Sequence, residues 1–278
     1  MSGTATGSGT VLFELAGGVG TVTLNRPERR NAISWQLVED LLAAVERARS
    51  ERGLRVLVLT GAGADFCVGA DLARAASDNA HDQDTRTLRG RSVADDLDRL
   101  GRASTIVETL VNFPVPTIAA INGACAGAGL ALALAADFRL AAQGAAFNTA
   151  FVSAGVSGDL GSAWLLARAV GDARARALLL DPAKFTAAEA SEWGLVTETT
   201  ADLPPGSANW QVSSPPSRRR RCATRRRTWR TPGWRHCPTT SSARCPAWWT
   251  APAATTRGRR PGLPGEAQAG VHRRVGTA

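Results

Sequence analysis

Apolar positions in the first third of the chain change from a strand period to a helix period and back. Runs at Val11–Leu15 and Val19–Leu24, joined by Ala16-Gly17-Gly18, predict a β-hairpin. After Ser34, apolar residues recur every three or four positions, which predicts a helix capped by the Ser34 side chain. Leu54–Leu59 is a continuous apolar run of strand length and predicts a buried strand.

The same alternation continues through the middle of the chain. Ile106–Phe113 has helical spacing and is stopped by Pro114, and Pro116–Ile121 then predicts another strand. Leu130–Ala136 predicts a helix of small residues, and Phe138–Ala141 predicts a further strand. Strands that alternate with helices in this way predict an α/β fold with helices packed on a sheet.

Composition divides the chain into a body, residues 1–203, and a tail, residues 204–278. The body holds 18 Lys and Arg against 23 Asp and Glu, whereas the tail holds 15 arginines and one acid, Glu266. The tail also contains ten prolines and only four Val or Leu residues, with no Ile and no Phe. It cannot bury enough aliphatic surface to offset its ordering entropy, so we expect an irregular or disordered basic tail.

Several features indicate a soluble protein of the reducing cytoplasm. The first ten residues lack the basic and apolar regions of a signal peptide, and Leu130–Ala136 is too short to span a membrane. Cys67 and Cys125 are the only cysteines of the body. No metal site is predicted, because neither the cysteines nor the three histidines have ligand spacing: His81, His236 and His272.

Two loops, Asp65–Leu72 and Asn122–Gly129, place small residues between a predicted strand and a predicted helix. Glycine allows such loops to bring backbone N–H groups close to a ligand. The start of a helix adds unpaired donors that suit an anion or a developing oxyanion. Taken singly, each loop is equally well interpreted as an ordinary tight turn.

Together, the loops and their surroundings resemble the enoyl-CoA hydratase/isomerase (crotonase) family over residues 11–200. The order and spacing of seven segments agree with that family: Asn25–Ala32, Phe66–Asp71, Pro116–Gly129, Ala136–Leu140, Phe147, Gly171–Arg176 and Thr186–Val196. The resemblance implies a ClpP-like spiral of ββα units that assembles as a homotrimer or hexamer. It also implies an acyl-CoA thioester substrate of the kind met in fatty acid metabolism, with no cofactor beyond the coenzyme A of the substrate.

The resemblance further implies roles for individual residues. The N–H groups of Ala70 and Ala128 would form the oxyanion hole for the thioester carbonyl. Substrate contacts would come from a larger set around these two: Arg30, Ala32, Ala70, Asp71, Leu72 and Ala128. Arg30 and Ala32 would hold the nucleotide end of coenzyme A, although a solvated arginine and a strand-end alanine would look the same in the sequence.

The chain lacks both glutamates that act as acid and base in a typical hydratase, because Ala131 and Phe151 stand at those positions. Asp159 matches the carboxylate that some family members use for proton shifts along the acyl chain. One carboxylate can remove a proton from one carbon and return it to another, which favours isomerisation. Alternatively, Asp159 caps the helix expected near Ser162, and the chain is a non-catalytic acyl-CoA-binding homologue.

Three interpretations of the tail remain open. It is disordered, or it is a nucleic-acid arm in which Arg218–Arg221 and Arg225–Arg227 contact phosphates while nearby tryptophans stack on bases. The third is a shifted reading frame. Permitted codons for Gly258–Arg274, read one nucleotide later, can encode an amphipathic helix with a short extended end, which resembles the end of a crotonase. We favour the shifted frame, and nucleic-acid binding the least.

Overall fold

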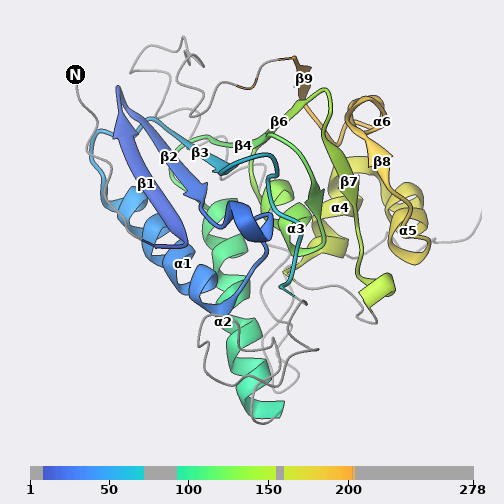
Figure 1. Ribbon diagram of the computed structural model, residues 1–278, viewed down its shortest axis with the longest axis horizontal. Helices are drawn as coiled ribbons and strands as arrows, with labels where there is room; N and C mark the ends of the chain where they lie inside the picture. The colour runs from blue at the N-terminus through green and yellow to red at the C-terminus, as the bar shows by residue number, and fades with distance from the viewer. Residues whose placement is uncertain (1–8, 72–92, 155–159, 202, 204–278) are drawn as a thin grey trace, which may run out of the picture. The chain divides into compact units, whose positions relative to one another are not determined.

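A computed structural model describes residues 9–71, 93–154, 160–201 and 203, and the tail 204–278 lies outside these described residues. A six-stranded sheet has the order β1-β2-β3-β4-β6-β9 (Figure 1). Its strands are β1 (Val11–Ala16), β2 (Val19–Leu24), β3 (Val56–Gly61), β4 (Thr117–Ile121), β6 (Phe138–Ala142) and β9 (Glu198–Thr200). A second sheet has the order β5-β7-β8, with strands β5 (Cys125–Ala126), β7 (Ala146–Asn148) and β8 (Phe185–Thr186).

The large sheet opens with the predicted hairpin. β1 and β2 are antiparallel, with Val11 opposite Leu24, and every later pairing in this sheet is parallel. The turn needs glycine, because Gly17 and Gly18 have φ angles of 56° and 85°. A side chain at Gly18 would also displace the Arg55 side chain, which lies against this glycine.

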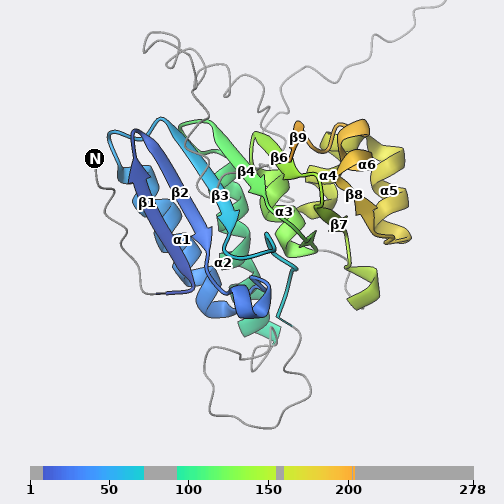
Figure 2. The same cartoon turned by 45° about the horizontal axis from the view of Figure 1, so that its top comes forward.

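In the described part of the chain, six α-helices connect and cover the strands (Figures 1 and 2). They are α1 (Trp35–Ser50), α2 (Val93–Val111), α3 (Ala128–Ala135), α4 (Ser162–Val170), α5 (Asp172–Leu180) and α6 (Ala187–Glu192), with short 3-10 turns η1 (Pro27–Arg29) and η3 (Val152–Ala154). The predicted cap of α1 is confirmed, because the Ser34 hydroxyl accepts a hydrogen bond from the Leu37 N–H at 3.2 Å. None of the described helices is long and apolar enough to cross a membrane.

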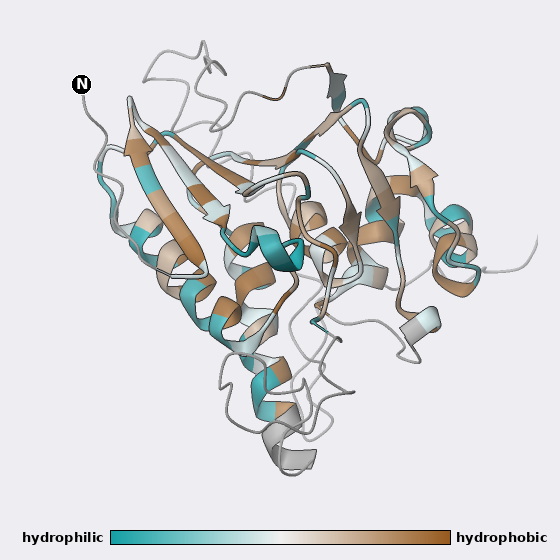
Figure 3. Ribbon diagram, viewed as in Figure 1, coloured by the Kyte–Doolittle hydropathy of each residue, from teal (hydrophilic) through white to brown (hydrophobic). Residues whose placement is uncertain are grey.

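The main core lies between the sheet and the helices α1, α2 and α3. One side of α1 is hydrophobic and the other hydrophilic (Figure 3), and its apolar side packs on β1 and β2. Strand β3 is buried on both faces, because Leu57 and Leu59 join this core while Val56 and Val58 join a second cluster on the opposite face. This explains why the segment is apolar without alternation, and the α/β class is confirmed.

The two tryptophans of the body's later helices differ from each other in burial. Trp193 is half-buried and lies 5.1 Å from the ring of Phe185, as expected for the edge of the core. Trp164 is 37% exposed and lies outside the buried core. The guanidinium of Arg168, one helical turn later, lies 4.5 Å from its ring centroid and covers the indole instead of the core.

Candidate active site

The two loops singled out in the sequence lie side by side and are built alike. Each contains a Cys-x-Gly-Ala segment, Cys67–Ala70 after β3 and Cys125–Ala128 before α3. Cys67 and Cys125 form an isolated parallel bridge. The glycines have positive φ angles, 94° at Gly69 and 52° at Gly127, a conformation that L side chains rarely adopt. Both alanines therefore follow a turn that requires glycine.

Backbone hydrogen bonds hold the two loops against each other. The Phe66 and Cys67 N–H groups donate to the Ala124 carbonyl, each at 3.1 Å, and the Ala126 N–H donates to the Cys67 carbonyl at 2.9 Å. A Cβ at Gly129 would lie 2.3 Å from that same Cys67 carbonyl oxygen, so no larger residue fits there. The relative placement of the loops is thus fixed by the backbone itself.

The N–H groups of Ala70 and Ala128 make no hydrogen bond to any described residue. Ala128 is the first residue of α3, where a helix leaves its N–H groups without internal partners. Ala70 lies in a parallel bridge with Ile33, but the bonds of that bridge use the Gly69 carbonyl and the Asp71 N–H. Two backbone donors without a partner among the described residues therefore come from adjacent loops.

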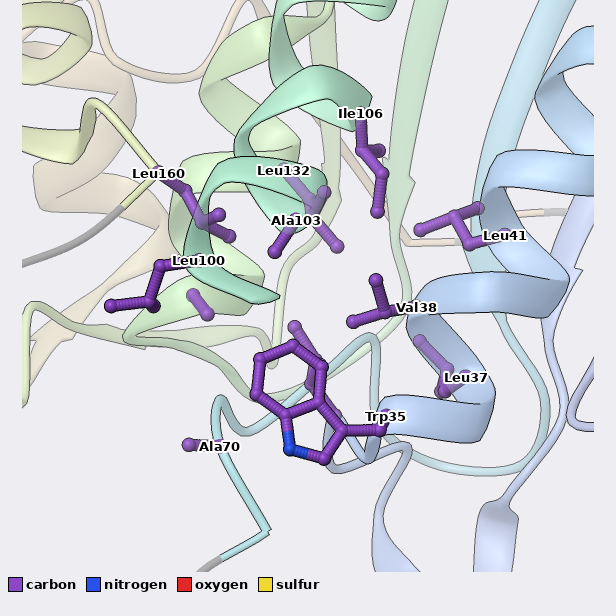
Figure 4. Close-up of a pocket in the computed structure, with 12 residues that line it drawn as sticks. Trp35, Leu37, Val38, Leu41, Ala70, Leu100, Ala103, Ile106, Leu132 and Leu160 are labelled. Atoms are coloured by element: carbon purple, nitrogen blue, oxygen red, sulfur yellow. The ribbon is translucent and has the colours of Figure 1, made fainter. Parts of the chain in front are cut away.

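Ala70 and Ala128 line one pocket whose wall is apolar (Figure 4). Helices α1, α2 and α3 supply most of the rest of the wall, which includes Trp35, Leu41, Leu100, Ile106 and Leu132. In Figure 4 the indole of Trp35 stands between Ala70 and the helices, and Leu160 and Leu100 lie across the pocket from Leu41. None of the lining residues that the structure describes is charged, so this part of the pocket suits an uncharged apolar group.

Arg30 forms an ion pair at the edge of the site. Its Nε lies 2.6 Å and its Nη2 3.2 Å from the two carboxylate oxygens of Asp65, while the Arg30 side chain stays 61% exposed. Asp65 also accepts a hydrogen bond from the Ala124 N–H at 2.9 Å, which joins the two loops. The Arg30 hydrogen bond lowers the pKa of Asp65, burial opposes this, and the Ala124 N–H adds to the lowering.

Asp71 lies directly after Ala70 and is almost completely buried. Its carboxylate accepts hydrogen bonds from Arg26 at 3.0 Å and from Arg29 at 2.5 Å. Burial raises the pKa of Asp71, but hydrogen bonds from Arg29 and Arg26 and the charges of both outweigh it and hold the pKa below its usual value. Sequence reasoning gave no role to either arginine, although both belong to the matching segment Asn25–Ala32.

The remaining predicted residues divide into described and undescribed ones. Ala32 is buried, and so are Ala131 and Phe151, at 0% and 5% exposure. Leu72 and Asp159 lie outside the described residues. Helix α4 begins at Ser162 as expected, with Gly161 before it. Within the described part of the chain, no cluster of His, Cys, Asp or Glu could hold a metal ion.

The buried thiols of the two loops are weak acids. Burial raises the pKa of Cys67 to about 12, and burial, with the neighbouring Cys67, raises the pKa of Cys125 well above its usual value. Thiols in this state are not nucleophiles at neutral pH. Cys67 and Cys125 therefore fill space between the loops and do not supply chemistry.

Comparisons with known proteins agree on one family. A family model described as enoyl-CoA hydratase/isomerase matches residues 14–203. A "Probable enoyl-CoA hydratase" of Rhodobacter capsulatus is 39% identical over 70% of each chain. The 1,2-epoxyphenylacetyl-CoA isomerase of Escherichia coli is 36% identical over 69% of this chain and 70% of its own.

Solved structures lead to the same family. The crystal structure of an enoyl-CoA hydratase from Thermoplasma volcanium has a TM-score of 0.68 and 28% identity, covering 80% of this chain and 84% of that one. The enoyl-CoA hydratase of Bacillus anthracis has a TM-score of 0.61 and 31% identity, covering 69% and 70%. The expected crotonase fold is confirmed, and this chain belongs to the enoyl-CoA hydratase/isomerase family.

Proposed function

We propose that this protein acts on an acyl-CoA thioester as an enoyl-CoA hydratase or isomerase, with the N–H groups of Ala70 and Ala128 as an oxyanion hole. One observation carries the proposal: two backbone donors without partners among the described residues line the same apolar pocket. A thioester carbonyl that enters the pocket can accept both hydrogen bonds. The acyl group beyond it then packs on apolar side chains.

The two donors act on the charge that develops during the reaction. Removing a proton from the acyl chain, or adding one at C2, passes through an enolate whose negative charge is concentrated on the carbonyl oxygen. Fixed N–H groups stabilise this oxygen without having to reorganise at the moment of reaction. Removing one such donor typically costs about 3 kcal/mol of transition-state stabilisation.

Proton transfer requires a side chain as well as the oxyanion hole. By resemblance we assign it to Asp159, because the two glutamate positions hold the buried apolar residues Ala131 and Phe151. A single carboxylate suits the removal of a proton from one carbon and its return to another.

An assay of the purified protein with 2-enoyl-CoA and 3-enoyl-CoA thioesters tests the proposal. We expect interconversion of the two, and we expect Asp159→Asn to retain binding of the thioester while losing turnover. Binding without any turnover by the parent protein would favour a second candidate, a non-catalytic acyl-CoA-binding homologue. The apolar residues Ala131 and Phe151 are the observation that supports that candidate.

A further inference from the structure

A buried ion-pair cluster lies directly beside one of the two donors. The Asp71 carboxylate accepts hydrogen bonds from Arg26 Nη2 at 3.0 Å, from Arg29 Nη2 at 2.5 Å and from Arg29 Nε at 3.3 Å. The side chains of Asp71 and Arg26 are only 6% and 7% exposed. The Asp71 carboxylate is therefore bound by two arginines of the protein itself, and these two contacts fix its position.

The backbone next to Asp71 determines the direction of the Ala70 N–H. The Ile33 N–H donates to the Gly69 carbonyl at 2.7 Å, and the Asp71 N–H donates to the Ile33 carbonyl at 2.9 Å. In an extended segment, successive N–H groups point to opposite sides. The Gly69 carbonyl and the Ala70 N–H belong to one trans peptide and point in opposite directions, so the Ala70 N–H points away from Ile33, and anchoring the adjacent Asp71 limits how far this peptide can turn.

Arg26 is itself held by the turn that follows β2. Its backbone N–H donates to Asn31 Oδ1 at 2.9 Å, and its Nη1 donates to the Ala32 carbonyl at 2.6 Å. Asn31 is fully buried, and its amide donates to the Asp65 carbonyl at 2.7 Å. Arg30 and Asn31 have φ angles of 54° and 56°, which non-glycine residues adopt only where surrounding contacts hold them.

We infer that Asp71 is a positioning residue that aims the Ala70 N–H at the thioester oxygen, with Arg26 and Arg29 holding Asp71 in place. The inference rests on the proposed function of Ala70 as an oxyanion donor. Asp71 does not touch the reacting atoms. It anchors the residue after the donor to a rigid turn, so the donor keeps its direction while substrate enters and leaves. A misplacement of about 1 Å can cost roughly 100-fold in rate.

The variant Asp71→Asn tests this role, because it preserves the shape of the side chain and removes the charge that holds both arginines. We expect kcat to fall roughly 10- to 100-fold, with KM changed by less than about threefold. The matched control is Asp172→Asn, which breaks an exposed pair with Arg176 on α5 and should leave both constants unchanged. Circular dichroism and melting temperature establish that each variant is folded at the assay temperature.

A spectroscopic measurement separates positioning from a general loss of structure. Acetoacetyl-CoA, a 3-oxoacyl thioester, absorbs differently as its enolate, and the oxyanion hole should raise the enolate fraction of the bound ligand. Asp71→Asn should still bind acetoacetyl-CoA but should lower that enolate band. If Asp71→Asn fails to fold, Arg29→Lys replaces it, because Arg29 is 36% exposed and Arg26 stays paired. Arg29→Lys should lower kcat and the enolate band, as expected for Asp71→Asn.

Two failures would be distinguishable. If the parent protein is active and the folded Asp71→Asn variant keeps the parent's kcat and enolate band, the positioning role is wrong. The proposed function would still stand. A parent protein that neither turns over enoyl thioesters nor raises the enolate band would overturn the proposed function, and the positioning role with it.

Discussion

At the scale of single residues, Gly69 is the most restrictive position in the first loop. Its φ angle is 94°, and an added Cβ would lie 3.1 Å from the Ala126 carbonyl oxygen. Gly69→Val should therefore lower acyl-CoA turnover by roughly 10²-fold or more, because a β-branched residue resists the turn that places the Ala70 N–H.

Steady-state kinetics and circular dichroism on the same preparation check this prediction. The body should stay folded, since the change affects a loop between formed elements. Gly53→Val offers a control, because nothing lies within 4 Å of a Cβ at that glycine. Unchanged turnover in Gly69→Val would mean that the loop is only a structural turn.

The lowered pKa values of Asp65 and Asp71 predict a pH dependence of stability. A carboxylate whose pKa is lower in the folded state stabilises that state fully above its unfolded pKa, about 3.9. This stabilisation is lost as the pH falls through the lower folded pKa. Urea unfolding followed by tryptophan fluorescence between pH 7 and pH 3 should show a free energy that is flat at first and then decreases.

Asp71→Asn should be less stable than the parent at pH 7, because it leaves two arginines with a weaker acceptor, and its stability should depend less on pH below 4. A variant with the parent's pH dependence would show that the Asp71 carboxylate is not the group responsible.

These residues also mark what a sequence can predict about a site. The two loops were identified from a local property, small residues at strand and helix boundaries, whereas the roles of Ala70 and Ala128 came from the resemblance to the family. The partners of Asp71 were not identified, since Arg26 and Asp71 are 45 positions apart and only the fold brings them together. Trp35 was likewise missed as a pocket residue because its spacing agrees equally well with an ordinary helix start.

At the scale of elements, the pocket is formed where α1, α2 and α3 face one another, so its width depends on small side chains. Ala103 on α2 lines it and is 6% exposed. Ala103→Leu should fill part of the space and lower kcat/KM for longer acyl chains by roughly tenfold, while the shortest substrates are less affected. Overpacking should also lower stability by about 1–3 kcal/mol.

A series of enoyl-CoA thioesters of increasing chain length measures this effect. Ala43→Leu is the matched control, because Ala43 is exposed on α1 and does not line the pocket. Equal losses at every chain length would show that the acyl group does not occupy this pocket.

Elements were predicted well where the pattern is long and poorly where it is short. The hairpin and the strands near residues 56 and 117 agree with the structure, as does α1, because each has five or more residues of one period. The strands β5 and β8 have two residues each, too few to show any period. Their sheet exists because the loops before α3 and α6 pair with β7, which is a tertiary effect.

At the scale of the whole molecule, two independent observations separate residues 204–278 from the body. The family match ends at residue 203, and the relatives from Rhodobacter capsulatus and Escherichia coli are each covered over 70% of their length. Charge and proline content change at the same position. A gene read in a different frame from this point would produce both changes at once, whereas a selected basic arm would explain only the composition.

We therefore predict that shifting the reading frame by one nucleotide near codon 205 returns a family-like C-terminus. The restored protein should gain helical signal in circular dichroism, melt at a higher temperature and form a trimer. The reason is that the added helices would supply apolar side chains to bury, whereas residues 204–278 contain only four Val or Leu residues. Size-exclusion chromatography with light scattering measures the oligomer, and limited proteolysis after residue 203 compares the two ends. If the unaltered protein resists proteolysis there and melts as high as the restored one, the basic segment is a selected feature. Binding of DNA or RNA that weakens with salt would then be the property to measure.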